Sequence, residues 1–384
     1  MKRIGLLSAV FFLLATLVVA SQPESGAYIR VVDVGAGLCC VAKLPDSHYM
    51  VYDAGNYVDK GKSAMKAIKE MIPDDATIDL LVLSHSDSDH NGAVPDICRD
   101  YKITKILRDG LERTTKVWEA ANAAIVAKAK DEGCEDVNLK HNPVAPGTRY
   151  ELGSASAVFV CGWYDLPKDW VPLHPNEQIN ARSIVIRLEY AGKSVLFAGD
   201  TVGRHKGDPD VNACIAAEQY MVSNISAVPI HSEVVIAPHH GSDAASSQAW
   251  VSAVAPDYVI FSCGHKYGHP WASTAQRYLD AGVPLLNIFR TDIGDNEALD
   301  PHDVDGKYEW SYGMNKEGHK AGTGDVGVWI RPDGMLTVSY LVDKSIAAKS
   351  WIVPATQPTV QPSTENECRP PAARWRLFRR HRCW

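Results

Sequence analysis

The stretch LSHSDSDHNG, residues 83–92, constrains this chain more than any other feature. It places two histidines and two aspartates within six residues, directly after the apolar run 78–83, which has the composition of a buried strand. Side chains alternate along an extended segment, so His85 and the two aspartates point to one side, and a turn lets His90 face a neighbouring position. Such residues also cap helices, but four of them together favour a metal site.

Three further groups of metal-capable residues follow strand-like runs in the same way. The runs are SVLFAG, EVVIAP and DYVIFSC, and the residues after them are Asp200, His239 with His240, and His269. Side chains that follow several strands can meet at one edge of the sheets, as catalytic groups on rigid scaffolds do. We therefore expect the four groups to form one site.

Strands dominate the rest of the pattern, and helices interrupt them. Helical spacing or composition predicts helices near 62–72, 114–132 and 273–281, and the turn Pro332-Asp333-Gly334 predicts a hairpin near the end of the folded region. This alternation indicates two sheets with outer helices, an α/β layered fold.

The two ends of the chain differ from the part between them. Residues 1–20 combine Lys2 and Arg3 with an apolar run and a small-residue cleavage point, which predicts a signal peptide and hence a secreted or periplasmic protein. An uncleaved anchor is the alternative, but the run is diluted and a polar stretch follows it at once. Residues 353–384 form a Pro/Thr-rich linker and an arginine-rich tail.

The charge of the chain is distributed unevenly. The formal net charge is −7, and the cationic ends leave −13 on residues 21–352, the expected hydrolase domain. A body this acidic does not attract nucleic acid through its overall field. Attraction to a phosphate polymer must come from bound metals or from the tail, which can also bind an anionic surface.

Several motifs in order resemble one family. The pattern His-x-Asp-x-Asp-His-x-Gly resembles the metallo-β-lactamase fold in the HxDxDH variant that is typical of the soluble domain of the DNA-uptake protein ComEC. The further matches are DVG at 33–35, YDAG at 52–55, Asn180 with Ser183, GD at 199–200, HHGS at 239–242, GHP at 268–270 and RTD at 290–292. The opening motif lacks the usual Gln and Asp after DVG. We expect no ComEC-like membrane channel beside the domain.

This resemblance implies a four-layer αββα sandwich with the metal site at one sheet edge. The segment 93–179, before the third metal motif, is long and rich in tryptophan, and we interpret it as an insertion beside the site.

The resemblance also implies a role for each motif residue. His85 and Asp87 hold one divalent ion, while Asp89, His90 and His269 hold the second, and Asp200 reaches both. Asp89 also orients the nucleophile, and either His239 or His240 donates a proton or stabilises charge. The expected substrate contacts are Asn180, Ser183 and Ser242. Oxygen-rich ligands favour Mn²⁺ over Zn²⁺, although zinc can bind.

The predicted function is an exported hydrolase that cleaves phosphodiester bonds in DNA or RNA by a metal-bridged hydroxide. A hydrolase of a small ester, lactone or phosphonate is the first alternative, because the same pair of metals can attack a carbonyl. A binding protein with a relic metal site is the second. It would be favoured by the loss of Asp89 or Asp200, and both residues are present.

Overall fold

The computed structural model describes residues 26–55, 59–264, 267, 269–292 and 324–341. The expected signal peptide (1–20) and the linker and tail (353–384) lie outside these ranges. None of the helices in the described ranges combines the length and the apolar composition that crossing a bilayer requires.

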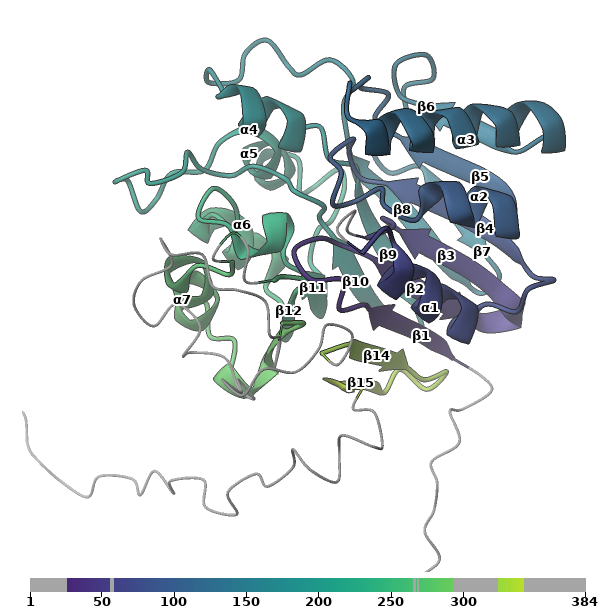
Figure 1. Cartoon of the computed structure of the whole chain (residues 1–384). Helices are drawn as coiled ribbons and strands as arrows, with labels where there is room; N and C mark the ends of the chain where they lie inside the picture. The colour runs from purple at the N-terminus through teal and green to yellow at the C-terminus, as the bar shows by residue number, and fades with distance from the viewer. Residues whose placement is uncertain (1–25, 56–58, 265–266, 268, 293–323, 342–384) are drawn as a thin grey trace, which may run out of the picture. The chain divides into compact units, whose positions relative to one another are not determined.

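Two mixed sheets form the centre of the fold (Figure 1). The first, sheet A, has the order β15-β14-β1-β2-β3-β4-β5-β6, with β3 to β6 parallel and the other pairs antiparallel. Its strands are β1 (Ala27–Val31), β2 (Cys40–Leu44), β3 (His48–Tyr52), β4 (Thr77–Leu83), β5 (Lys102–Arg108), β6 (Glu135–Asn138), β14 (Val326–Ile330) and β15 (Leu336–Tyr340).

The second sheet, sheet B, has seven strands in the order β13-β12-β11-β10-β9-β8-β7. Its β10 to β13 are parallel, and β7 to β10 are antiparallel. The strands are β7 (Arg149–Leu152), β8 (Ala155–Cys161), β9 (Val185–Tyr190), β10 (Lys193–Phe197), β11 (Val234–Ile236), β12 (Tyr258–Phe261) and β13 (Ile288–Arg290).

Helices cover the outer face of each sheet. Side chains of α1 (Lys62–Met71), α2 (Val94–Asp100) and α3 (Lys116–Glu132) share a buried cluster with one face of sheet A. Side chains of α5 (Ala216–Ser223), α6 (Gln248–Val254) and α7 (Ala272–Asp280) do the same on sheet B. The remaining short elements are α4 (Pro175–Asn180), η1 (Pro45–Ser47), η2 (Pro238–Gly241) and η4 (Leu285–Asn287).

The alternation of side chains along the strands explains why the two sheets pack as inner layers. In β4, Leu80 and Val82 join the cluster between the sheets, while Leu81 and Leu83 join the cluster under the helices. A strand that is apolar on both faces is typical of a sheet that is covered on both sides. The fold is therefore the four-layer αββα sandwich of the metallo-β-lactamase type.

Most of the segment 93–179 is not an insertion, which corrects the interpretation of the sequence. It supplies α2, β5, α3 and β6 on sheet A and β7 and β8 on sheet B. Trp118 of α3 is buried in the helix-covered cluster of sheet A. The stretch 162–174, between β8 and α4, is the part that belongs to neither sheet, and it carries Trp163 and Trp170.

The parallel strands of both sheets end at one edge of the sandwich, where the sheets are joined by hydrogen bonds. Ile184, before β9, donates its N–H to the Ser84 carbonyl after β4 at 2.9 Å and accepts from the Tyr52 hydroxyl at 2.6 Å. Ser262, after β12, donates to the Gly37 carbonyl at 2.8 Å. These contacts fix the strand ends of one sheet against those of the other.

Candidate metal centre

The loop after β4 carries the first cluster and is held by a carboxylate from the end of β3. Asp53 accepts hydrogen bonds from both the amide and the hydroxyl of Ser84 at 2.7 Å, and its Oδ2 lies 2.7 Å from His90 Nδ1. Because Nδ1 of His90 faces Asp53, its Nε2 is turned towards the site. Asn91 donates to the His85 carbonyl at 3.0 Å, which fixes the other end of the loop.

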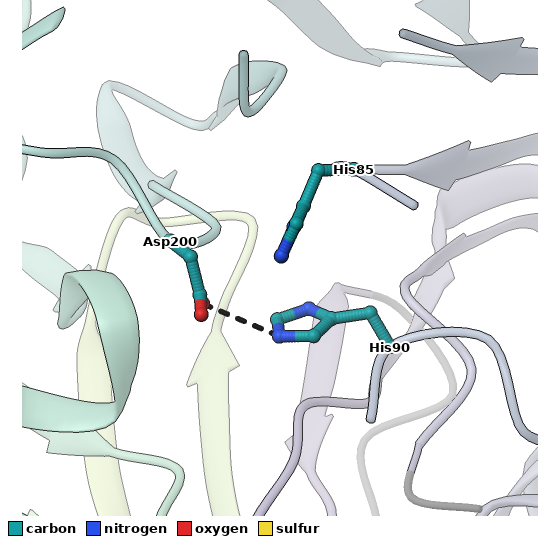
Figure 2. A group of neighbouring side chains, drawn as sticks. All are labelled: His85, His90 and Asp200. Carbon is teal, nitrogen blue, oxygen red and sulfur yellow. Dashed lines mark ion pairs between the residues drawn. The ribbon is translucent and has the colours of Figure 1, made fainter. Parts of the chain in front are cut away.

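His85, His90 and Asp200 converge on one point, as Figure 2 shows. Their ligand atoms lie within 4.8 Å of one another, and all three residues are buried. His90 Nε2 is 3.3 Å from Asp200 Oδ1. His85 Nε2 and Asp200 Oδ1 have no hydrogen-bond partner among the described residues. Buried polar atoms without such a partner are uncommon, and two of them facing one point fit the ligands of a metal ion.

Asp200 is placed by the turn that follows β10. Its amide donates to Ser183 Oγ at 2.9 Å. The preceding Gly199 has a φ of +54°, and a Cβ there would lie 2.8 Å from the Cβ of Ser84. A glycine is required at this position because the backbone is left-handed and the two sheets approach each other closely.

A second group of ligand atoms combines Asp89, His90 and His240. His240 Nδ1 donates to the Ser262 carbonyl at 2.7 Å, so its Nε2 faces the cluster. That Nε2 lies 3.4 Å from Asp200 Oδ2, 3.6 Å from Asp89 Oδ2 and 3.2 Å from His90 Nε2. His240 therefore has the position and orientation of a metal ligand.

The two histidines of the HHGS motif adopt an unusual backbone. His239 and His240 have φ values of 51° and 55°, in the left-handed region that few non-glycine residues occupy. The conformation is held by hydrogen bonds from the His239 amide to the Gly199 carbonyl at 2.9 Å and from the Ser242 amide to the His239 carbonyl at 2.8 Å. Strained backbone of this kind concentrates at functional sites.

His239 is the more exposed histidine of the HHGS motif, and the buried Asn180 lies beside it. Asn180 Nδ2 lies 3.2 Å from His239 Nε2, which in turn lies 3.8 Å from Asp200 Oδ2. The His239 side chain is 22% exposed, compared with 5% for His240. Asn180 Oδ1 and His239 Nδ1 have no hydrogen-bond partner in the described part of the chain. Both atoms are buried as well as unpartnered.

Two residues lie differently from the sequence expectation. The His269 ring centroid is 5.7 Å from that of His239 and 6.2 Å from that of His240, and His269 belongs to neither group of converging ligand atoms. Ser242 is buried, and its hydroxyl accepts from the Ala244 amide at 3.3 Å. The described contacts of Ser242 are those of a turn.

Comparison with known proteins gives the family. A model of the metallo-beta-lactamase superfamily matches residues 32–265, which is more than half of the chain. The chain belongs to this superfamily. Competence protein ComA of Neisseria gonorrhoeae is 24% identical over 274 residues, 71% of this chain and 32% of ComA. The chain thus spans about a third of the length of that curated relative.

Solved structures of the metallo-beta-lactamase fold include similar chains. The fold protein YhfI from Bacillus subtilis has a TM-score of 0.39 and 9% identity, and the match covers 69% of this chain and 97% of YhfI. The metallo hydrolase Igni18 from Ignicoccus hospitalis has a TM-score of 0.39 and 13% identity, with 69% of this chain and 95% of Igni18 covered.

Members of the metallo-beta-lactamase superfamily are typically hydrolases, and the residues present fit a metal. Imidazole nitrogens and carboxylate oxygens are ligands for divalent ions such as zinc. His85 Nε2 and Asp200 Oδ1, which have no hydrogen-bond partner in the described part of the chain, point towards the same position. His90 and His240 each use Nδ1 for a contact in the protein and so present Nε2, the arrangement usual for metal-bound histidines.

The electrostatics of the cluster also fit a cation. Burial by itself raises the pKa of Asp200, but His240, His90 and His239 outweigh it and hold that pKa well below its usual range. Burial lowers the pKa of His240, yet Asp200 and Asp89 raise it to about 10. A bound cation would supply the positive charge that these carboxylates favour.

Several residues around the centre were not assigned a role from the sequence. Asp53 lies in a motif that the sequence does show, but its hydrogen bonds to the ligand loop become visible only in the fold. Arg113 Nη2 lies 3.1 Å from Asp87 Oδ1, and no motif marks it. Asp109, at the end of β5, is fully buried, and burial raises its pKa to about 7.

A further group of histidines lies outside the cluster. His174, Glu177 and His205 bring ligand atoms within 4.8 Å of one another, and His205 Nδ1 lies 2.9 Å from Glu177 Oε2. From the sequence, both histidines read as isolated loop residues. Glu177 lies in α4, the helix that ends at Asn180, and it accepts a hydrogen bond from the His174 amide. Its contact with His205 joins this helix to the loop after Asp200.

Proposed function

We propose that this protein is a metal-dependent phosphodiesterase that cleaves DNA or RNA. The observation that carries the proposal is the convergence of ligand atoms from both sheets on one buried point, with His85 Nε2 and Asp200 Oδ1 lacking hydrogen-bond partners in the described part. Ligands from several strand ends on a rigid frame favour a catalytic centre over a structural one.

We propose two ions, with one change from the sequence interpretation. His85 and Asp87 hold the first ion, Asp89 and His90 hold the second, and Asp200 reaches both. His240 takes the ligand position that the sequence interpretation gave to His269, because the Nε2 of His240 faces Asp89 and Asp200. The three carboxylates Asp87, Asp89 and Asp200 enrich the proposed ligand set in oxygen, which favours Mn²⁺ as activator while Zn²⁺ would still bind.

The surrounding residues supply positioning and proton transfer. Two divalent ions held by these residues would supply a water of lowered pKa and polarise a phosphoryl group. Asp89 and Asp200 orient the attacking group from opposite sheets. Asn180 and His239 lie next to each other beside Asp200. In this proposal they donate hydrogen bonds to phosphoryl oxygens, and His239 passes a proton to the leaving oxygen.

Cationic side chains beside the cluster support an anionic substrate. Arg113 lies beside Asp87, Arg182 directly precedes Ser183, and Lys206 Nζ lies 5.3 Å from the ring centroid of Trp271. The formal net charge of the chain is −7, so its overall field does not attract phosphate. The attraction must then come from local cations such as these. The 24% identity to a competence protein adds support.

The export of the protein and the role of its tail remain proposals from the sequence. We propose that residues 1–20 are removed on secretion and that the arginine-rich end of 353–384 attaches the hydrolase domain to an anionic surface. An intact mass that begins near Ser21 in the secreted protein supports export, and a retained leader on purified protein contradicts it.

The test of the function uses the mature protein, linear DNA, RNA, bis(p-nitrophenyl) phosphate and a small lactone. Each substrate is incubated with Mn²⁺, with Zn²⁺ and after chelation. We expect cleavage of the three phosphodiesters with metal and none after chelation. Cleavage of the lactone without any diester cleavage would establish the small-ester alternative instead. No turnover of any substrate would favour a binding protein with a relic site.

A further inference from the structure

A pocket of about 310 Å³ lies at the ends of β6 and β8. Aromatic rings form much of its wall, from Phe159, Trp163, Tyr164 and Tyr220, and Lys140 stands at its side. Its volume is at the small end of the range for ligand sites. The pocket therefore suits one small planar group and its attached charge.

This pocket adjoins the candidate metal centre through a short path of chain. The Trp163 amide donates to the Arg182 carbonyl at 3.2 Å, so the loop after β8 lies against the segment before β9. Ser183, the next residue, accepts the Asp200 amide hydrogen bond at 2.9 Å. The pocket wall is thus linked through residues 182 and 183 to the turn that places Asp200.

Two cations lie near the ring of Tyr164: Lys140 lines the pocket, and Arg182 adjoins it through that ring. Lys140 Nζ is 5.3 Å and Arg182 Cζ is 5.9 Å from the ring centroid of Tyr164. Arg182 Nε and Nη1 are buried and have no hydrogen-bond partner among the described residues. A guanidinium with unused donors is suited to a phosphate, which it binds through two parallel hydrogen bonds.

The Trp163 ring is held in place by its neighbours. It makes edge-on contacts with Trp170, at a centroid distance of 4.9 Å, and with Tyr220, at 5.1 Å. A fixed aromatic wall beside cations is the combination with which proteins bind single-stranded nucleic acid. Asp165 is the carboxylate on the pocket wall, and its exposure to solvent weakens its repulsion of phosphate.

We propose that this pocket binds one unpaired nucleotide next to the phosphodiester that is cleaved, with the base against Tyr164 and Trp163 and a phosphate on Arg182 and Lys140. This inference rests on the proposed function and sharpens it, because a base can enter the pocket only when it has left a duplex. The substrate is therefore single-stranded DNA or RNA, or an unpaired end.

The test is an equilibrium binding measurement that needs no turnover. A fluorescein-labelled 12-nucleotide single strand and the matching duplex are titrated with the full protein in chelator, and binding is followed by anisotropy. We expect tighter binding of the single strand. Tyr164→Leu and Arg182→Gln should each weaken it about tenfold, the effect of losing one stacked base or one phosphate contact.

Two further variants serve as controls for that measurement. Tyr164→Phe keeps the ring and should bind as the wild type does, and circular dichroism shows whether each variant is folded. Lys168→Gln removes an exposed charge from the same loop outside the pocket, and it should leave single-strand binding unchanged.

The outcomes separate this inference from the proposed function. Three results would each contradict the proposal that the pocket binds an unpaired nucleotide. They are wild-type affinity of the folded Tyr164→Leu variant, no binding of the single strand by the wild type, and equal affinity for the duplex. Tyr164-dependent binding in a protein that cleaves no diester with any metal supports the pocket and overturns the phosphodiesterase. Diester cleavage with binding that is insensitive to Tyr164 supports the phosphodiesterase and overturns the pocket.

Discussion

The two sides of the metal centre are built differently. On the sheet A side, Asp53 receives three contacts at 2.7 Å from Ser84 and His90, and the ligand loop has little freedom to move. On the sheet B side, His239 has a left-handed backbone and an unpartnered Nδ1 within the described part, and it is partly exposed. This difference agrees with the proposal that sheet A mainly holds the ions and that sheet B also meets the substrate.

Asp200 is the residue of sheet B whose loss should have the largest effect. Asp200→Asn removes the carboxylate that faces both His90 and His240, so both ions lose a ligand. We expect kcat/KM on bis(p-nitrophenyl) phosphate to fall by about 1,000-fold, which is about 4 kcal/mol of barrier. A folded Asp200→Asn variant with wild-type activity would contradict the proposal that sheet B supplies a metal ligand.

Asp89 tests the contribution of sheet A to the same chemistry. Asp89→Asn keeps the size of the side chain and removes its charge, and activity should fall by at least ~100-fold, about 2.7 kcal/mol. The fold should survive because Asp89 lies in a loop at the sheet edge. His141→Gln, an exposed site outside every motif, should change little, with circular dichroism as the folding control. Full activity of Asp89→Asn would refute the assigned role.

Asp53 tests whether the rigid side of the centre depends on its supporting carboxylate. Asp53→Asn leaves every proposed ligand in place but weakens the contact that orients His90. We expect the affinity for Mn²⁺ or Zn²⁺, measured by calorimetry, to fall by about 10- to 100-fold. Asp169→Asn, at an exposed site, is the matched control. Equal affinities in the two variants would show that the loop holds its shape without Asp53.

Asp243 tests the anchoring of the histidine loop on sheet B, and we expect its effect to be the smallest. It accepts from Ser273 Oγ at 2.6 Å and from the Gly207 amide at 3.0 Å. Burial raises the pKa of Asp243, but Ser273, Gly207 and Arg277 outweigh it and lower that pKa below its usual value.

The sign of the resulting pH dependence follows from that depressed pKa. The charged Asp243 stabilises the fold above the unfolded-state pKa of about 4, and this stabilisation is lost as the pH falls through the folded-state pKa. Asp243→Asn should lower the free energy of unfolding by about 1 kcal/mol at pH 7. Urea titrations at pH 7 and pH 3 measure the difference between variant and wild type, which should shrink at pH 3. A constant difference would contradict the assignment.

The sequence shows more of the geometry of the candidate centre on the sheet A side than on the sheet B side, for a physical reason. The ligands of sheet A lie in one loop, so the spacing of His85 to His90 carries most of the geometry. On sheet B, the orientation of His240 depends on the Ser262 carbonyl, 22 residues later in the chain. No local pattern shows which of His239, His240 and His269 turns a nitrogen towards the cluster.

The fold shows the same limit. The layered α/β class, the three predicted helices and the final hairpin follow from local patterns, and the structure confirms them. The segment 93–179 was misread because β5 to β8 contain no metal motif. Their membership of the sheets depends on pairing with distant strands, such as β8 with β9.

The central claim is that ligands from both sheets hold two divalent ions and that His240 is one of those ligands. The direct measurement is the metal content of the wild type, His240→Ala and His269→Ala after saturation with Mn²⁺ or Zn²⁺ and removal of free metal. We predict about two ions per chain in the wild type and in His269→Ala, and about one in His240→Ala. A wild type that binds no metal, or a second ion lost in His269→Ala and retained in His240→Ala, would contradict the claim.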